Sequence, residues 1–178
     1  MRQSKLPSEQ FHKEKEEKFL NYVQTDRRPE NNYTAQNTFV SDHLYLNELL
    51  DKYQSERKKG LNGAVDHLQR FECALERHIE CEELTLFPAA RKHGDAKLNV
   101  QVDMLEEEHV EIRDRIKTLK EKLVSAGMDC EHEEMQLIYK LGEHNAREEY
   151  HVYPRLGEIF SEAETRQVEK ALATPLPP

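Results

Sequence analysis

A block that pairs histidine with glutamate occurs twice in this chain of 178 residues. The copies read H-x3-E-E-x3-F-P and H-x3-E-E-x3-Y-P, and they begin 66 residues apart at His78 and His144. A further histidine stands 35 residues before each copy, at His43 and His109, and so repeats with the same offset. Imidazole and carboxylate groups duplicated at helical spacing are what two metal ions sharing one protein core would need.

Each copy offers two carboxylates, and their spacing from the histidine separates them. Glu82 and Glu148 follow their histidines by four residues, which places both groups on one helix face, about 6 Å apart along the axis. Glu83 and Glu149 lie roughly 140° round the helix from the histidine, so we expect them to face solvent or a neighbouring helix. The predicted metal ligands are therefore His43, His78, Glu82, His109, His144 and Glu148.

The surroundings of these residues favour metal binding over ordinary burial. His109 lies between Leu105 and Ile112 on an aliphatic stripe, so its ring is expected to point inward. A single inward histidine is more often a hydrogen-bonded core residue than a ligand. Here each of four helices brings one, and two uncompensated buried carboxylates would cost several kcal/mol each. Two cations between them would offset that cost.

The donor types restrict which metal the site would hold. Mixed imidazole and carboxylate donors suit Fe, Mn or Zn, and a pair of carboxylates able to bridge favours a di-iron centre. With two imidazoles, both carboxylates and an oxo or hydroxo bridge, each ion would have five donors. One position on an octahedral ion then stays open, and an open ferrous site binds O2, NO or peroxide.

Apolar residues recur at helical spacing over four long segments, at about 38–58, 64–92, 96–125 and 131–153. Short connections between them predict an all-α, antiparallel up-down-up-down four-helix bundle over residues 34–157. Residues 158–178 are expected to form a short helix and a tail. Residues 1–33 are expected to form an N-terminal helical arm and linker. A thin apolar stripe at 8–23 fits a homodimer contact, docking on the bundle, or a solvated arm.

Composition excludes several other classes of protein. The formal net charge of −9 opposes nucleic-acid binding, and no apolar run approaches the roughly 20 residues of a membrane span. Met1 to Gln10 contain no apolar signal-peptide core, which predicts a cytoplasmic protein. The cysteines show no C-x-x-C spacing, and we interpret them as reduced thiols packed in the core: Cys73, Cys81 and Cys130.

The doubled block with two upstream histidines resembles the hemerythrin-like family, the H-HxxxE cation-binding domain, from about Phe39 to Pro154. This resemblance implies a four-helix bundle that holds a non-haem di-iron site. It implies one iron on His43 and His78, the other on His109 and His144, with Glu82 and Glu148 as bridges.

One position departs from the oxygen-carrying members of that family. They have a fifth histidine, from an H-x3-H pair on the third helix, whereas Leu105 and Arg113 stand four residues either side of His109. This departure argues against reversible O2 carriage. The set of four histidines and two glutamates is more similar to the Repair of Iron Centers proteins, which respond to nitric oxide and oxidative stress. Those proteins often carry an N-terminal module with a cysteine, which this chain lacks.

Two functions fit these observations, and a third fits them poorly. The first is a di-iron protein that binds or processes O2, NO or peroxide, or that handles iron in nitrosative or oxidative stress, with or without enzymatic turnover. The second is a non-enzymatic iron or oxygen sensor, or an iron store, with metal-dependent partner binding. The third is a purely structural bundle, which gives no reason for the matched histidines and glutamates.

Overall fold

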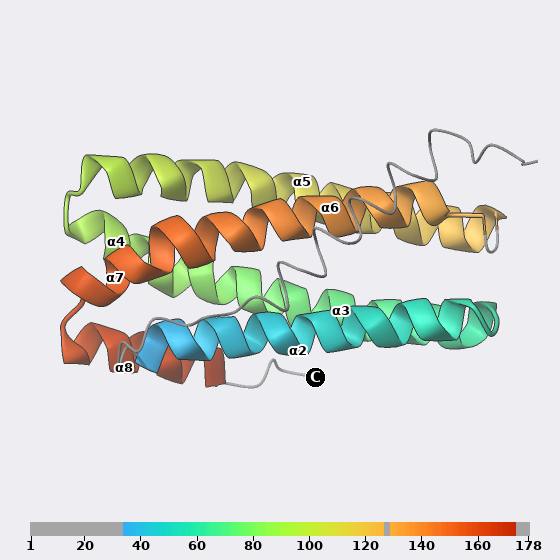
Figure 1. Ribbon diagram of the computed structural model, residues 1–178, viewed down its shortest axis with the longest axis horizontal. Helices are drawn as coiled ribbons and strands as arrows, with labels where there is room; N and C mark the ends of the chain where they lie inside the picture. Colours follow the sequence, from blue (N-terminus) through green and yellow to red (C-terminus); the bar gives the residue numbers. More distant parts are fainter. Residues whose placement is uncertain (1–33, 127–128, 174–178) are drawn as a thin grey trace, which may run out of the picture. The chain divides into compact units, whose positions relative to one another are not determined.

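The computed structural model describes residues 34–126 and 129–173, and in that part of the chain every regular element is helical. Four long helical segments run antiparallel (Figure 1). They are α2 (Thr34–Arg57), α3 (Leu61–Cys81) continued by η1 (Glu82–Leu86) and α4 (Phe87–Lys92), α5 (Ala96–Ala126), and α6 (Glu131–Arg147) continued by η2 (Glu148–Val152) and α7 (Tyr153–Ile159). The all-α bundle predicted from the sequence is confirmed.

The bundle consists of two helical hairpins, as the 66-residue repeat predicts. α2 packs along α3, and α5 packs along α6 (Figure 1). The turn between α4 and α5 depends on two residues. Gly94 adopts a φ of 67°, a left-handed conformation that favours glycine. Asp95 then accepts the backbone N–H groups of Lys97 (3.0 Å) and Leu98 (3.1 Å), which caps the start of α5.

A layer of polar side chains divides the apolar core into two clusters. On α5, Leu105 belongs to one cluster, His109 lies in the layer, and Ile112 belongs to the other. The cluster at the α2–α3 turn includes Leu46, Leu50, Leu75, Leu119 and Leu141. The cluster at the α4–α5 turn includes Phe39, Leu86, Phe87, Val102 and Tyr153. Burial of a large apolar side chain contributes about 1.5–3 kcal/mol, so both clusters support the layer between them.

Glu134 is a buried carboxylate near the α2–α3 turn, and the charge of Arg57 balances its own. Glu134 accepts a hydrogen bond from the Gln54 side chain (2.8 Å) and forms an ion pair with Arg57 (2.6 Å). The hydroxyl of Tyr53 lies 3.9 Å from the sulfur of Cys130. This cluster links α2 to α6 and needs no cation of its own.

The cysteine prediction is correct for two thiols and wrong for the third. Cys81 and Cys130 are buried, whereas Cys73 is exposed, and all three are free thiols. Cys73 lies midway between the buried residues Phe71 and Leu75 on α3. Two residues turn a helix by roughly 200°, so Cys73 faces away from the core.

The C-terminal helix α8 (Glu162–Ala173) packs beside α2 and α3, and it buries Val168 and Leu172 in the apolar cluster at the α4–α5 turn. The predicted arm and linker at 1–33 and the end of the tail, residues 174–178, lie outside the described residues. The division at residue 157 stays a prediction.

Among the described helices, none is long and apolar enough to cross a membrane.

Candidate metal centre

The polar layer holds all six residues that the sequence singles out. Each long helical segment supplies one histidine, and the two glutamates open η1 and η2. None of the six is more than 2% exposed: His43, His78, Glu82, His109, His144 and Glu148. The structure therefore brings together all six predicted ligands in one buried layer.

Both glutamates begin a single π-helical turn. The N–H of Phe87 donates to the carbonyl of Glu82, and the N–H of Tyr153 donates to the carbonyl of Glu148, each across five residues. A proline follows each aromatic residue, and because it lacks an N–H the regular helical ladder cannot continue through it. The F-P and Y-P pairs thus explain the two π turns, which in proteins frequently mark functional sites.

The inner faces of the histidines meet the two glutamates at short distances. Glu148 places Oε2 at 3.1 Å from His43 Nε2 and Oε1 at 2.9 Å from His144 Nε2. Glu82 places Oε2 at 3.5 Å from His78 Nε2 and at 3.3 Å from His109 Nε2. Both carboxylates therefore span the two hairpins.

These atoms form two overlapping groups that suit a metal ion. One group contains Glu82, His109, His144 and Glu148, and the other contains His43, His78 and Glu148. Within each group the candidate ligand atoms lie no more than 4.8 Å from one another. Since Glu148 belongs to both groups, its carboxylate is placed to bridge two ions.

A carboxylate meets the outer nitrogen, Nδ1, of every histidine in the layer. The pairs are His43 with Glu149 (2.7 Å), His78 with Asp42 (3.0 Å), His109 with Glu83 (2.9 Å) and His144 with Glu108 (3.2 Å). Such a contact makes Nδ1 the donor, and it turns the Nε2 lone pair toward the centre of the layer. Each imidazole is thus held in the orientation that a metal ligand requires.

Sequence reasoning identified these acceptors only in part. Glu83 and Glu149 were expected to face solvent or a neighbouring helix, and the structure places them against histidines of a neighbouring helix. Asp42 and Glu108 were missed, although each directly precedes an upstream histidine and the two are 66 residues apart.

Basic side chains keep three of these acceptors ionised. Arg77 pairs with Asp42, Arg113 with Glu83, and Arg147 with Glu108. Burial opposes ionisation of Glu108, but His144, Arg147 and Lys140 outweigh burial and lower its pKa to about 2. The pKa values of Asp42 and Glu83 are also lowered, again against burial, by their histidine and arginine partners. Three of the four Nδ1 acceptors are therefore ionised carboxylates paired with cations.

Several atoms at the centre of the layer make no hydrogen bond within the protein. They are Glu82 Oε2, His109 Nε2, His144 Nε2 and both carboxylate oxygens of Glu148. The Nε2 atoms of His43 and His78 lie 3.2 Å apart, and with Nδ1 as the donor on each ring two lone pairs face each other. Buried polar atoms without partners are costly. Cations between them would satisfy these atoms, so the donor set fits a metal centre.

The carboxylates of the layer favour protonation of two of its histidines. Burial alone would lower the pKa of His43, but Glu148 and Glu149 outweigh it and raise that pKa to about 10. The pKa of His144 is raised to about 9 against the same effect of burial, by Glu148 and Glu108. A metal ion entering this layer must therefore displace protons.

The repeat differs at one aromatic position that touches the layer. Phe87 stacks on His109 with ring centroids 5.7 Å apart. Its counterpart Tyr153 lies against His43 at 5.8 Å, and its hydroxyl donates a hydrogen bond to Glu82 Oε1 at 2.8 Å. Burial and the neighbouring carboxylates Glu148 and Glu82 raise the pKa of Tyr153, so the hydroxyl keeps its proton. The sequence motif contains this F/Y difference, but sequence reasoning assigned it no role.

The positions of the missing fifth histidine are filled by residues that cannot bind metal. Leu105 is fully buried among apolar side chains. Arg113 points to Glu76 and Glu83 instead of the layer. Neither position four residues from His109 therefore supplies the fifth ligand that oxygen carriers have.

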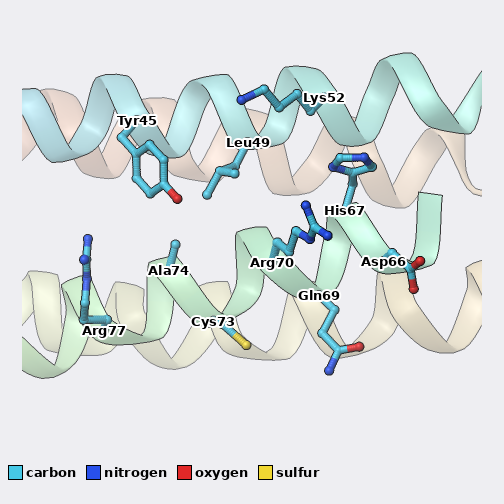
Figure 2. A pocket seen from close by; sticks show the side chains of 10 residues that line it. All are labelled: Tyr45, Leu49, Lys52, Asp66, His67, Gln69, Arg70, Cys73, Ala74 and Arg77. Atoms are coloured by element: carbon cyan, nitrogen blue, oxygen red, sulfur yellow. The ribbon is translucent and has the colours of Figure 1, made fainter. Parts of the chain in front are cut away.

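A groove of about 770 Å³ lies between α2 and α3, and Arg77, the partner of Asp42, lines one end of it (Figure 2). Its ten lining residues include Tyr45, Lys52, His67, Arg70 and Cys73, and none of the six layer residues. We therefore do not assign it to the metal centre.

The fold and the buried layer together define a helical bundle with a metal centre. The model of one family, the hemerythrin HHE cation-binding domain, matches residues 34–156. The chain therefore belongs to the hemerythrin HHE family and is a metal-binding protein. No curated protein and no solved structure matches it.

Substitutions in the layer are expected to change the metal stoichiometry in steps. His43→Ala removes a donor from one group only, so bound iron should fall from about two ions per chain to about one. Glu148→Ala removes the carboxylate common to both groups and should leave almost none. His93→Ala is the control, because His93 is exposed and pairs with Glu164. Elemental analysis of reconstituted protein makes the measurement, and equal iron in all variants would refute the assignment.

Removal of an outer acceptor is expected to weaken metal binding without removing a ligand. Glu108→Gln loses the charge that orients His144, which should reduce metal affinity by about 10–100-fold. Glu111→Gln is the matched control, since Glu111 is exposed and shares Lys140 with Glu108. Competition with a chelator of known affinity measures the difference. Equal losses in both variants would assign the effect to surface charge.

Proposed function

We propose that this chain holds two iron ions in the buried layer and uses them to bind or process O2, NO or peroxide under nitrosative or oxidative stress. The observation that carries the proposal is the pair of overlapping donor groups that share Glu148. With three and four protein donors, two octahedral ions would keep positions for a small exogenous ligand. Bound ferrous iron would supply those positions and the electrons for redox chemistry.

The enclosure of the layer supports a small ligand. The donor side chains have exposed fractions of 0–3%, and apolar clusters close the layer on both sides. A diatomic molecule or peroxide fits such a site far better than a large substrate does. The protein would contribute fixed imidazole orientation through the Nδ1 carboxylates, and exclusion of bulk water through the apolar clusters.

The donor set also supports a reactive or sensing role over reversible O2 carriage. The fifth histidine of oxygen carriers is replaced on either side of His109 by Leu105 and Arg113. The similarity to the Repair of Iron Centers proteins stays a prediction on this basis, as do iron as the native metal and a cytoplasmic location. Zn and Mn would accept the same donors.

A second candidate function is an iron or oxygen sensor, or an iron store. α8 packs against η1, the turn that Glu82 opens, and the Cys81 sulfur lies 4.0 Å from the Val168 carbonyl of α8. Metal occupancy at Glu82 would thus act on an element next to α8. Such coupling would make partner binding depend on metal.

Ligand binding by the ferrous protein provides the test of the leading function. Anaerobic protein loaded with Fe(II) should show new near-UV and visible absorption when NO, O2 or hydrogen peroxide is added. Glu148→Ala, treated in parallel, should show no such bands, because it lacks the shared carboxylate. A loaded wild-type protein that stays spectrally silent to all three ligands would contradict the proposal.

Metal removal is expected to destabilise the bundle. The bound form gains stability by mass action, about 2.7 kcal/mol when free metal is 100-fold above its dissociation constant. The melting temperature of the loaded protein should therefore fall after chelation and recover when Fe(II) is restored. Glu148→Ala should melt at one temperature with or without chelator, and the same behaviour in wild type would exclude both candidate functions.

A further inference from the structure

We propose that Tyr153 makes the two metal positions unequal by holding one oxygen of Glu82 away from the ions. This inference rests on the proposed function, since it assumes that the layer binds two metal ions. Tyr153 acts here as a positioning residue, because its hydroxyl contacts a ligand rather than a metal.

Tyr153 stands out because the other residues of the site occur in both copies of the repeat. The four histidines, the two central glutamates and the four Nδ1 acceptors all have counterparts 66 residues away. At the aromatic position of the motif, Phe87 in one hairpin corresponds to Tyr153 in the other. Phe87 has no polar atom and stacks on His109, whereas the Tyr153 hydroxyl reaches into the layer. One oxygen atom therefore makes the two halves of the site differ.

The hydrogen bond from that hydroxyl changes what Glu82 offers. Tyr153 donates to Oε1 of Glu82 at 2.8 Å and lies 3.4 Å from His43 Nε2. Glu82 keeps only Oε2 directed at the histidines, 3.3 Å from His109 and 3.5 Å from His78. Glu82 falls in the donor group of His109 and His144 and not in that of His43 and His78.

No hydrogen bond from the described residues holds either oxygen of Glu148, although its carboxylate also lies close to Tyr153. Its Oε1 faces His144 at 2.9 Å and its Oε2 faces His43 at 3.1 Å, so it offers one oxygen to each side. The result is a group of four donors around His109 and His144, and a group of three around His43 and His78. The two donor groups differ in size because Tyr153 donates a hydrogen bond to Glu82 and not to Glu148.

The inequality has a chemical consequence. An ion with three protein donors is held less tightly and keeps more positions for exogenous ligands than an ion with four. The His43–His78 position is therefore the one that exchanges its metal first.

A cobalt titration of the metal-free chain tests this role. Co(II) is added to wild type, to Tyr153→Phe and to Tyr53→Phe in the presence of a competing chelator, and the d–d absorption of each bound ion is followed. Tyr53→Phe is the matched control: it also removes a buried hydroxyl, one that lies beside Cys130 outside the layer. Thermal melting of each variant fixes a titration temperature at which all three are folded.

The expected result is two unequal affinities in wild type and in Tyr53→Phe. In Tyr153→Phe both oxygens of Glu82 become free, so the weaker site should tighten and the ratio of the two affinities should fall by about tenfold. The spectra of the two bound ions should also become more alike.

A Tyr153→Phe variant that retains the wild-type ratio and spectra would overturn the inference. So would a wild type that binds two cobalt ions with equal affinity. A folded wild type that binds no cobalt would instead overturn the proposed metal centre, which separates failure of the function from failure of the role of Tyr153.

Discussion

The mutual approach of four inward imidazole nitrogens and two carboxylates is the interaction on which the rest of the structure depends. Their Nε2 and oxygen atoms meet at 2.9–3.5 Å in the middle of an apolar bundle. Without positive charge between them, lone pairs and buried negative charge would repel. The carboxylates raise the pKa values of His43 and His144, so a proton on either ring adds positive charge to the layer, and a metal ion would have to displace that proton.

The remainder of the bundle holds that arrangement in place. Outer carboxylates fix each ring, basic residues such as Arg77 and Arg113 keep those carboxylates charged, and apolar clusters on both sides exclude water. The two π turns also belong to this arrangement, because each starts at a central glutamate and accommodates the proline that follows. Local backbone geometry and the site are thus encoded by the same repeated block.

The sequence predicted the bundle and the six central residues because both depend on periodicity. Helical spacing identifies one face of each helix, and the repeat shows that the inward polar groups are matched. The sequence alone does not predict contacts between helices, such as that of Asp42 with His78, because these depend on how two helices are rotated against each other. The hydrogen bond from Tyr153 to Glu82 depends on the same rotation, so the sequence alone does not predict it. The outward position of Cys73 does follow from periodicity, because Cys73 lies between Phe71 and Leu75 on α3.

The most direct test of the central claim is a crystal structure of the iron-loaded chain with anomalous diffraction recorded at the iron absorption edge. The account predicts two anomalous peaks inside the layer, one beside His43 and His78 and one beside His109 and His144, with Glu148 between them. Absence of peaks in the layer, or iron found only at surface groups, would contradict it.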